Sequence, residues 1–222
     1  MLVWYVVLVI AGYLVGSLPF GLYVARLSRR IDSSPPDRPV ANVAPVDLYR
    51  RSGPALRQGR GLAGIVFLLE LAKGFSPTFT GYLALGTPGA VGGGSAALVG
   101  HTFPFFGRLR GSSSVAPLLG VLLAVYPIVV VILSMIWTAA LAAWRYASLA
   151  ALVTASVSPL ALAALDAGGD YENVVVLAAV LWSLLIFFAH RGNIRRLVSG
   201  REARINAPVG ERGEARRGRR VR

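Results

Sequence analysis

Apolar runs long enough to cross a membrane alternate with clusters of arginine along most of this chain. A helix of about 20 apolar residues spans the ~30 Å hydrocarbon layer of a bilayer. Hydrophobic residues make up 55% of the 222 residues, and the mean hydropathy is +0.62. These values exclude an ordinary soluble domain. The sequence therefore predicts an all-α integral membrane protein.

The arginines lie between or after the apolar runs. Arginine supplies 22 of the 23 basic residues: eight between Arg26 and Arg60, two at Arg108 and Arg110, Arg145, and eleven from Arg191 to Arg222. Loops on the cytoplasmic side of membrane proteins carry such an excess, and they attract anionic lipid headgroups. We therefore expect the net charge of +13 to reflect membrane topology and not nucleic-acid binding.

The charge pattern predicts the topology. If the apolar stretch Val115–Trp144 is split near Tyr126-Pro127, every arginine falls on one side and Asp166, Asp170 and Glu172 fall on the other. The first run breaks at Gly16-Ser17-Leu18-Pro19, and we expect a retained span, because the first charge follows the run. The result is a bundle of seven transmembrane helices, some short and broken, with segments at about 2–25, 62–85, 89–106, 115–126, 127–144, 146–165 and 173–189.

This arrangement places the N-terminus outside and the C-terminus in the cytoplasm. Residues 1–199 then form one multi-pass domain of the cell membrane. Residues 200–222 are charged and aperiodic, which predicts a disordered basic tail on the cytoplasmic face. The stretch from Leu27 to Gly61 is rich in Pro, Ser and Arg, so a long loop is expected there.

Several chemistries are excluded or unsupported. The chain has no cysteine and two histidines, so thiolate sites, disulfides and a metal centre are not expected. Motifs for nucleotide binding, serine hydrolases and zinc proteases are missing as well.

The best candidate anion site is the stretch Arg108-Leu109-Arg110-Gly111-Ser112-Ser113-Ser114. Glycine and serines before a helix offer N–H groups and hydroxyls to a phosphate, and arginines can pair with it. A capped helix start beside topogenic arginines explains the same residues equally well.

Four other polar residues lie within or at the ends of apolar segments. Glu70 and Lys73 stand at i and i+3 in a predicted span, which indicates an internal ion pair or a substrate contact. His101 lies among aromatic residues and is typical of a packing residue. His190 ends the last span, where either a catalytic or a structural role is possible.

In order along the chain, these segments resemble the bacterial PlsY family of membrane acyl-phosphate:glycerol-3-phosphate acyltransferases. The resemblance covers most of residues 12–205. The matching stretches are GYLVGSLPFGLYVARL at 12–27, LLELAKGFSP at 68–77, GHTFPFFGRLRG at 100–111, RYASLAAL at 145–152 and HRGNIRRLVSGRE at 190–202. The resemblance implies a seven-helix bundle with its site on the cytoplasmic side.

Two family motifs are altered in this chain. The first motif keeps Asn42 and Arg50, but its serine is replaced by Val40. The second is a glycine-rich loop whose lysine is replaced by Ser113. The third is intact at His190, Asn193 and Glu202.

The resemblance also implies a role for each site residue. His190, Asn193 and Ser148 would be catalytic, with Glu202 and His101 supporting them. The substrate phosphates would be bound by Asn42, Arg50, Arg108, Arg110, Gly111, Ser112, Ser113 and Ser114. The substrates would be acyl-phosphate and glycerol 3-phosphate, and no cofactor is needed because the acyl-phosphate is already activated.

The expected function is therefore transfer of a fatty acyl group to the 1-hydroxyl of glycerol 3-phosphate, which gives lysophosphatidic acid for phospholipid biosynthesis. Because of the altered motifs, the alternative is a catalytically inactive family member with a binding or regulatory role. An unrelated transport or scaffold role is a third hypothesis, although the sequence shows no internal repeat of the kind transporters have. The sequence predicts no oligomeric state.

Overall fold

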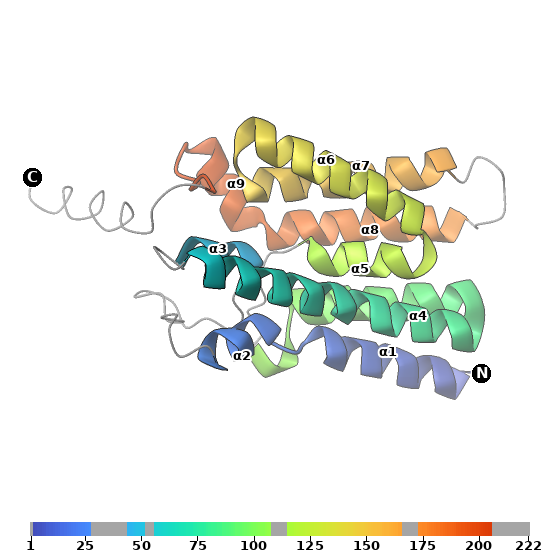
Figure 1. Cartoon of the computed structure of the whole chain (residues 1–222). Coiled ribbons are helices and arrows are strands. Elements are labelled where there is room, and N and C mark those ends of the chain that lie inside the picture. Colours follow the sequence, from blue (N-terminus) through green and yellow to red (C-terminus); the bar gives the residue numbers. More distant parts are fainter. Residues whose placement is uncertain (1, 28–43, 52–55, 108–114, 166–172, 206–222) are drawn as a thin grey trace, which may run out of the picture.

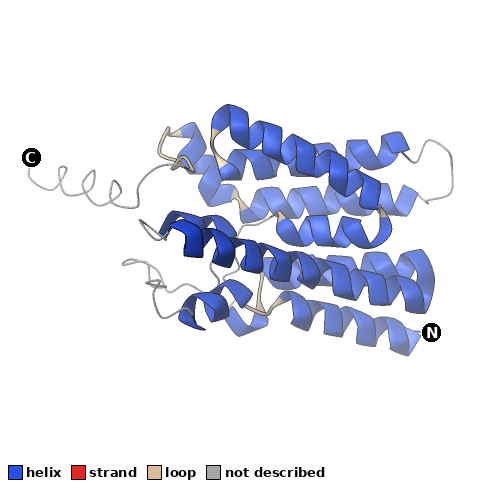
Figure 2. Ribbon diagram, in the orientation of Figure 1, coloured by secondary structure: helices blue, strands red, loops and turns tan. Residues whose placement is uncertain are grey.

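The computed structural model describes residues 2–27, 44–51, 56–107, 115–165 and 173–205. Every regular element in this part of the chain is a helix (Figure 2). In chain order these are α1 (Leu2–Gly16), α2 (Phe20–Leu27), α3 (Pro45–Arg51), α4 (Leu56–Thr102), the short 3-10 helix η2 (Phe105–Gly107), α5 (Ala116–Val125), α6 (Pro127–Trp144), α7 (Ala147–Leu165), α8 (Asn173–Ala189) and α9 (Arg191–Val198).

The first span is broken where its sequence predicts. Pro19 cannot donate a backbone hydrogen bond, so the helix stops at Gly16 and resumes at Phe20. At the break, the Ser17 hydroxyl donates a hydrogen bond to the Tyr13 carbonyl at 2.7 Å. Gly16 packs so closely that a Cβ there would lie 2.2 Å from the Ala97 carbonyl oxygen.

Helix α4 is a hairpin of two arms. Gly86 has φ 64° and ψ −149°, a conformation that side-chain-bearing residues rarely adopt, and the chain reverses there (Figure 1). The arms then pack through glycines: a Cβ on Gly81 would lie 2.2 Å from the Gly89 carbonyl oxygen. The hairpin confirms the two predicted segments at 62–85 and 89–106, although the helix begins earlier, at Leu56, and ends at Thr102.

The long apolar stretch 115–144 is also divided where expected. Helix α5 ends at Val125, and α6 starts at Pro127, whose missing N–H costs nothing in the first helical turn. With ten residues, α5 is only about 15 Å long, too short to cross a bilayer alone. Helix α6 ends at Trp144, and its C-cap residue, Arg145, has the left-handed φ of 60°.

The helices run side by side, and α1, the arms of α4, α6, α7 and α8 lie roughly parallel or antiparallel to one another (Figure 1). The main core lies between α4, α5, α6, α7 and α8. Large apolar side chains are exposed on the outside, including Met135 at 67% and Leu181 at 58%. Such a surface fits contact with lipid.

Four described helical stretches are long and apolar enough to cross a membrane: Leu2–Leu27, Gly61–Thr102, Pro127–Trp144 and Ala147–Leu165. Helices α8 and α9, bent by 62°, add a fifth if the pair counts as one span. Gly61–Thr102 folds back at Gly86 and therefore consists of two arms. With α8 and the short α5, the described helices match the seven expected segments.

Two expectations about irregular structure need correction. The expected loop from Leu27 to Gly61 contains α3 and the first turn of α4. The residues after His190 form a further helix, α9, that was not expected. Both helices are short, and their sequences lack a long apolar period, so pattern alone does not reveal them.

Candidate active site

A single carboxylate joins α7 to α9. Glu202 Oε1 accepts hydrogen bonds from Ser148 Oγ and Asn193 Nδ2, both at 2.9 Å. The other oxygen, Oε2, accepts from Arg196 Nε at 2.6 Å and forms an ion pair with it. The Glu202 side chain is only 5% exposed. This Glu202 network therefore fixes α9 against the start of α7 (Figure 1).

The chain reaches this position by a turn after α9. Gly200 has φ 64°, and the N–H of Arg201 donates to the Arg196 carbonyl at 2.7 Å. Residues 201–205 then run back toward α7, where the Ile205 N–H donates to the Arg145 carbonyl at 2.8 Å. The turn explains how Glu202 contacts a residue six positions earlier.

Glu202 is ionised at neutral pH. Burial raises the pKa of this carboxyl group, but hydrogen bonds from Arg196, Asn193 and Ser148 favour the charged form and outweigh burial. The net result is a pKa below the ordinary value. A charged acceptor also makes the three hydrogen bonds stronger than those of a neutral group.

His190 lies between α8 and α9 and is 2% exposed. Its Nδ1 is 2.9 Å from the Ile186 carbonyl oxygen. A carbonyl oxygen can only accept, so Nδ1 carries the hydrogen and Nε2 of the neutral ring is left with a lone pair. His190 is the N-cap of α9, and Asn193 and Arg196 follow it at intervals of three, the spacing of neighbours on a helix surface. The start of α9 can therefore present a base beside an amide.

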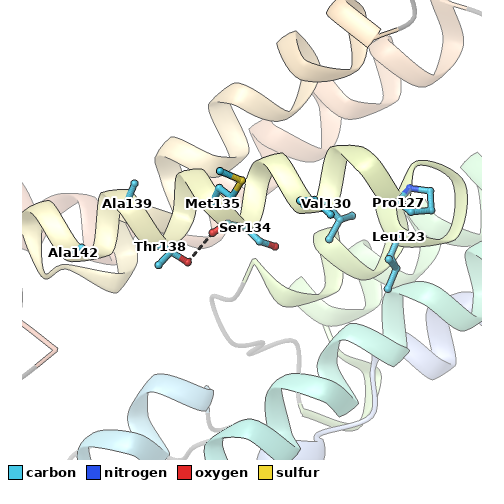
Figure 3. Close-up of a pocket in the computed structure, with 9 residues that line it drawn as sticks. Leu123, Pro127, Val130, Ser134, Met135, Thr138, Ala139 and Ala142 are labelled. Carbon is cyan, nitrogen blue, oxygen red and sulfur yellow. Dashed lines mark hydrogen bonds between the residues drawn. The ribbon is translucent and has the colours of Figure 1, made fainter.

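A groove of about 760 Å³ runs along α6. Figure 3 shows the side chains that line it, which come from α6 and the end of α5. The lining is almost wholly apolar, with Ser134 and Thr138 as its hydroxyl groups, and the Thr138 hydroxyl is bound to the Ser134 carbonyl at 2.8 Å. The groove is lined by Leu123, Pro127, Val130, Val131, Ser134, Met135, Thr138, Ala139 and Ala142.

The sequence of this chain is similar to those of known glycerol-3-phosphate acyltransferases. The family model described as "Glycerol-3-phosphate acyltransferase" matches residues 6–200. A glycerol-3-phosphate acyltransferase of Sinorhizobium fredii is 35% identical over 207 residues, which cover 91% of each chain. One of Desulforudis audaxviator is 37% identical over 203 residues, covering 90% of this chain and 96% of the relative.

The chain belongs to the glycerol-3-phosphate acyltransferase family. Its fold is similar to the crystal structure of PlsY, an integral membrane glycerol 3-phosphate acyltransferase, in its glycerol 3-phosphate form: the TM-score is 0.76 and the identity 32%, over 90% of this chain and 94% of that one. The lysophosphatidic acid form of PlsY matches with a TM-score of 0.74 and 30% identity, over 90% and 94% of the two chains. The expected family, the all-helical multi-pass membrane fold and the acyltransferase class are thereby confirmed.

The structure brings together part of the site that resemblance to the acyltransferase family implied. Ser148, Asn193 and Glu202 are joined by hydrogen bonds, and His190 is the N-cap of the helix that carries Asn193. His101 is not in this network; it contacts Glu70 and Lys73 in α4.

The expected phosphate-binding residues fall largely outside the described part of the chain. Arg50 lies in α3, and its side chain is not among the described ones. Asn42 and the whole stretch of Arg108, Arg110, Gly111, Ser112, Ser113 and Ser114 lie outside the described residues. The described neighbours of that stretch are Gly107, at the end of η2, and Val115, at the start of α5.

Sequence reasoning missed two features of this acyltransferase. It did not assign Arg196 to the site, although the spacing of three from His190 to Asn193 and again to Arg196 was a signal for a shared helix face. It also missed the groove along α6. An apolar run in a membrane protein carries no mark that separates a lipid-facing side from a groove, so no sequence signal could have found it.

Proposed function

We propose that this protein transfers a fatty acyl group from acyl-phosphate to the 1-hydroxyl of glycerol 3-phosphate, releasing lysophosphatidic acid and inorganic phosphate. The family membership supports the reaction. The similar PlsY crystal structures are described as the glycerol 3-phosphate form and the lysophosphatidic acid form of that enzyme. The observation that carries the proposal at residue level is His190, with Nδ1 tied to the Ile186 carbonyl and Nε2 left as an acceptor.

The proposed reaction needs one proton transfer. His190 Nε2 accepts the proton of the 1-hydroxyl while that oxygen attacks the acyl carbonyl carbon. The bond from the carbonyl carbon to the phosphate oxygen breaks, and the proton passes from His190 to the leaving phosphate. Protons and charges balance without a cofactor. Asn193 and Ser148 orient the reacting hydroxyl, and the carboxylate of Glu202 holds both side chains in place.

We assign the substrate phosphates to Asn42, Arg50, Arg108, Arg110 and the stretch Gly111–Ser114. Guanidinium groups pair with phosphate through two parallel hydrogen bonds, and the N–H groups of a glycine-rich stretch add further donors. A lysine at the position of Ser113 would supply a charge-assisted contact of about 1.5–3 kcal/mol. Arg108 and Arg110, which precede Ser113 in the sequence, provide charge of the same sign, which supports activity without that lysine.

The apolar groove along α6 is our candidate for the acyl chain. Its lining runs from Leu123 to Ala142. Only two residues separate the end of α6 from the start of α7, where Ser148 contacts Glu202. An acyl chain in the groove would therefore end near the Glu202 network. Replacing the exposed groove residue Ala139 with Phe is expected to shift the preferred acyl-phosphate to shorter chains by several carbons, measured with a chain-length series; an unchanged preference would contradict the assignment.

We further propose that the site faces the cytoplasm. Arg191, Arg195 and Arg196 of α9 lie at the end of the bundle away from the N-terminus (Figure 1). The excess of arginine at one end indicates the inner face of the membrane, where soluble glycerol 3-phosphate and anionic headgroups are both available. Residues 1–199 would form the membrane domain, and 200–222 the basic tail.

The function is tested by acyl transfer on detergent-purified protein with acyl-phosphate and labelled glycerol 3-phosphate. The wild-type protein should form lysophosphatidic acid, and His190→Ala should lower kcat by about 100-fold to 10,000-fold, the range for loss of a general base. Arg195→Ala is the matched control, because Arg195 is exposed in the same helix, and it should keep wild-type activity.

The alternative, an inactive family member that binds or regulates, makes a different prediction for the same protein. Folded wild-type protein would then form no more product than His190→Ala. Binding of glycerol 3-phosphate without turnover would favour this alternative.

A further inference from the structure

Three ionisable side chains are buried in α4, outside the Glu202 network. Glu70, Lys73 and His101 are 1%, 2% and 3% exposed. Glu70 Oε2 lies 3.0 Å from Lys73 Nζ and 3.0 Å from His101 Nδ1, and the Lys73 and His101 nitrogens are 3.5 Å apart. Glu70 and Lys73 belong to the first arm of α4, and His101 to the second. This buried cluster therefore links the two arms through charge.

His101 Nδ1 faces both other groups of the buried cluster, and its role depends on the tautomer. With a hydrogen it faces Glu70 as a donor, and without one it accepts from the Lys73 ammonium. Lys73 Nζ also lies 5.5 Å from the centre of the Phe20 ring in α2, a cation–π distance. Lys73 is the only lysine in a chain with 22 arginines. A compact ammonium fits between a carboxylate, an imidazole and a ring, whereas a planar guanidinium is larger and needs five donors satisfied.

The segment that follows the buried cluster contacts the segment that precedes His190. Phe103, two residues after His101, has its ring centre 5.6 Å from that of Phe188, two residues before His190. The Tyr13 hydroxyl donates to the Phe103 carbonyl at 2.9 Å and holds this turn against α1.

The residues of the proposed phosphate site follow α4 in the sequence. After Thr102 the chain passes through η2 to Gly107, and Arg108 follows.

Bundle stability alone does not account for the cluster. Burying two charges costs several kcal/mol per ion, and apolar residues of similar volume are often equally or more stabilising at such sites. Inside a membrane, charged side chains are expensive to keep and mark functional positions. A cluster that gives no clear gain in stability, and whose following segment packs against the one before His190, points to a role in the site.

We propose that the Glu70–Lys73–His101 cluster is a positioning device of the acyltransferase site, which holds the end of α4 against the end of α8 that His190 follows. The three residues act through the backbone they hold and do not contact the reacting atoms. This role rests on the proposed function, since it assigns glycerol 3-phosphate to a site that includes His190.

The test compares variants of the full-length purified protein by melting temperature, by kcat, and by KM for glycerol 3-phosphate. Glu70→Gln combined with Lys73→Met removes both charges at once and leaves neither partner unpaired. We expect it to fold with a melting temperature near that of the wild type, but with KM raised about 10-fold to 100-fold, because small misplacements of binding groups have effects of that size.

Two variants of His101 keep the test decisive if the double variant does not fold. His101→Gln retains a side chain that can donate to Glu70 or accept from Lys73 and should stay near the wild-type KM, whereas His101→Phe loses both abilities and should raise KM. Ser95→Ala is the matched control in the same arm: it removes the 2.9 Å hydrogen bond from Trp182 Nε1, so it should affect stability but not KM.

The outcomes separate the two proposals. Wild-type turnover together with unchanged KM in the double variant, or equal KM values for His101→Gln and His101→Phe, would overturn the positioning role alone. If the wild-type protein neither turns over nor binds glycerol 3-phosphate by calorimetry, the proposed function fails and this role fails with it. If it binds without turnover, the dissociation constant replaces KM as the measured quantity.

Discussion

Glu202 makes its contacts as a carboxylate, so its contribution should depend on pH. Its folded-state pKa lies below the ordinary 4.5, and its stabilisation is therefore complete above pH 4.5 and is lost as the pH falls through that lower value. Glu202→Gln removes the charge. At pH 7 it should lower stability by about 1 kcal/mol, since Arg196 is 33% exposed and its ion pair is partly screened. That loss corresponds to roughly 2–4 °C in apparent melting temperature.

The measurement is the difference in melting temperature between wild type and Glu202→Gln from pH 7 to pH 3. Taking the difference cancels the effect of other carboxyl groups that titrate in this range. The difference should stay constant down to about pH 4.5 and shrink below it. A difference independent of pH over the whole range would show that the charge of Glu202 does not stabilise the fold.

At the level of single residues, the sequence predicts most of the site. Resemblance to the family indicates Asn193, Ser148 and Glu202, and these three meet in one hydrogen-bonded network. The spacing of three places Arg196 near Asn193 on α9, but its contact with Glu202 depends on the turn at Gly200 that brings Glu202 back. Spacing alone does not predict a tertiary contact of this kind.

At the level of helices, close packing depends on glycines that cannot be told apart by sequence. Gly64 and Gly74 both lie in the first arm of α4. A Cβ on Gly74 would lie 2.0 Å from the Pro117 carbonyl oxygen in α5, whereas one on Gly64 would meet nothing within 4 Å. Gly74→Ala should therefore destabilise by about 1–3 kcal/mol through overpacking, and Gly64→Ala should stabilise by about 0.5–1 kcal/mol through reduced backbone entropy.

Thermal unfolding of the two single variants in the same detergent checks this prediction, because the same substitution in the same helix should have opposite signs. Gly74→Ala should also reduce acyl transfer, since it would push away α5, whose start follows the proposed phosphate site. Equal effects of the two substitutions would mean that α5 does not lie close enough to Gly74 to exclude a Cβ atom there.

Helix ends were predictable where proline or glycine determines them and not elsewhere. Pro19, Gly86 and Pro127 mark the three breaks, because each alters backbone geometry or removes a donor regardless of context. Helix α9 has no such marker. Its eight residues would be marginal in isolation, and its position is fixed by the contacts of Asn193 and Arg196 with Glu202.

For the whole molecule, the distribution of arginine and the apolar runs were sufficient to predict the fold class, because bilayer thickness and the cost of charge translocation act on the entire chain. The Glu70–Lys73 ion pair was also within reach, because its i, i+3 spacing predicts it. The groove along α6 and the approach of His101 to this pair were not, since both arise from how helices pack. Packing determines which apolar residues face lipid and which ionisable residues meet.

The orientation in the membrane remains a prediction, and the lack of cysteine makes it directly testable. Asn173 begins α8, and Ser199 follows α9 at the opposite end of the bundle; both are exposed (Figure 1). Single substitutions Asn173→Cys and Ser199→Cys introduce one thiol each, with no native thiol to remove. In intact cells, a membrane-impermeant maleimide should label Asn173→Cys, while Ser199→Cys should be labelled only after the membrane is permeabilised. The reverse pattern would place His190 and the Glu202 network on the outer face, away from cytoplasmic glycerol 3-phosphate, and would contradict the proposed topology.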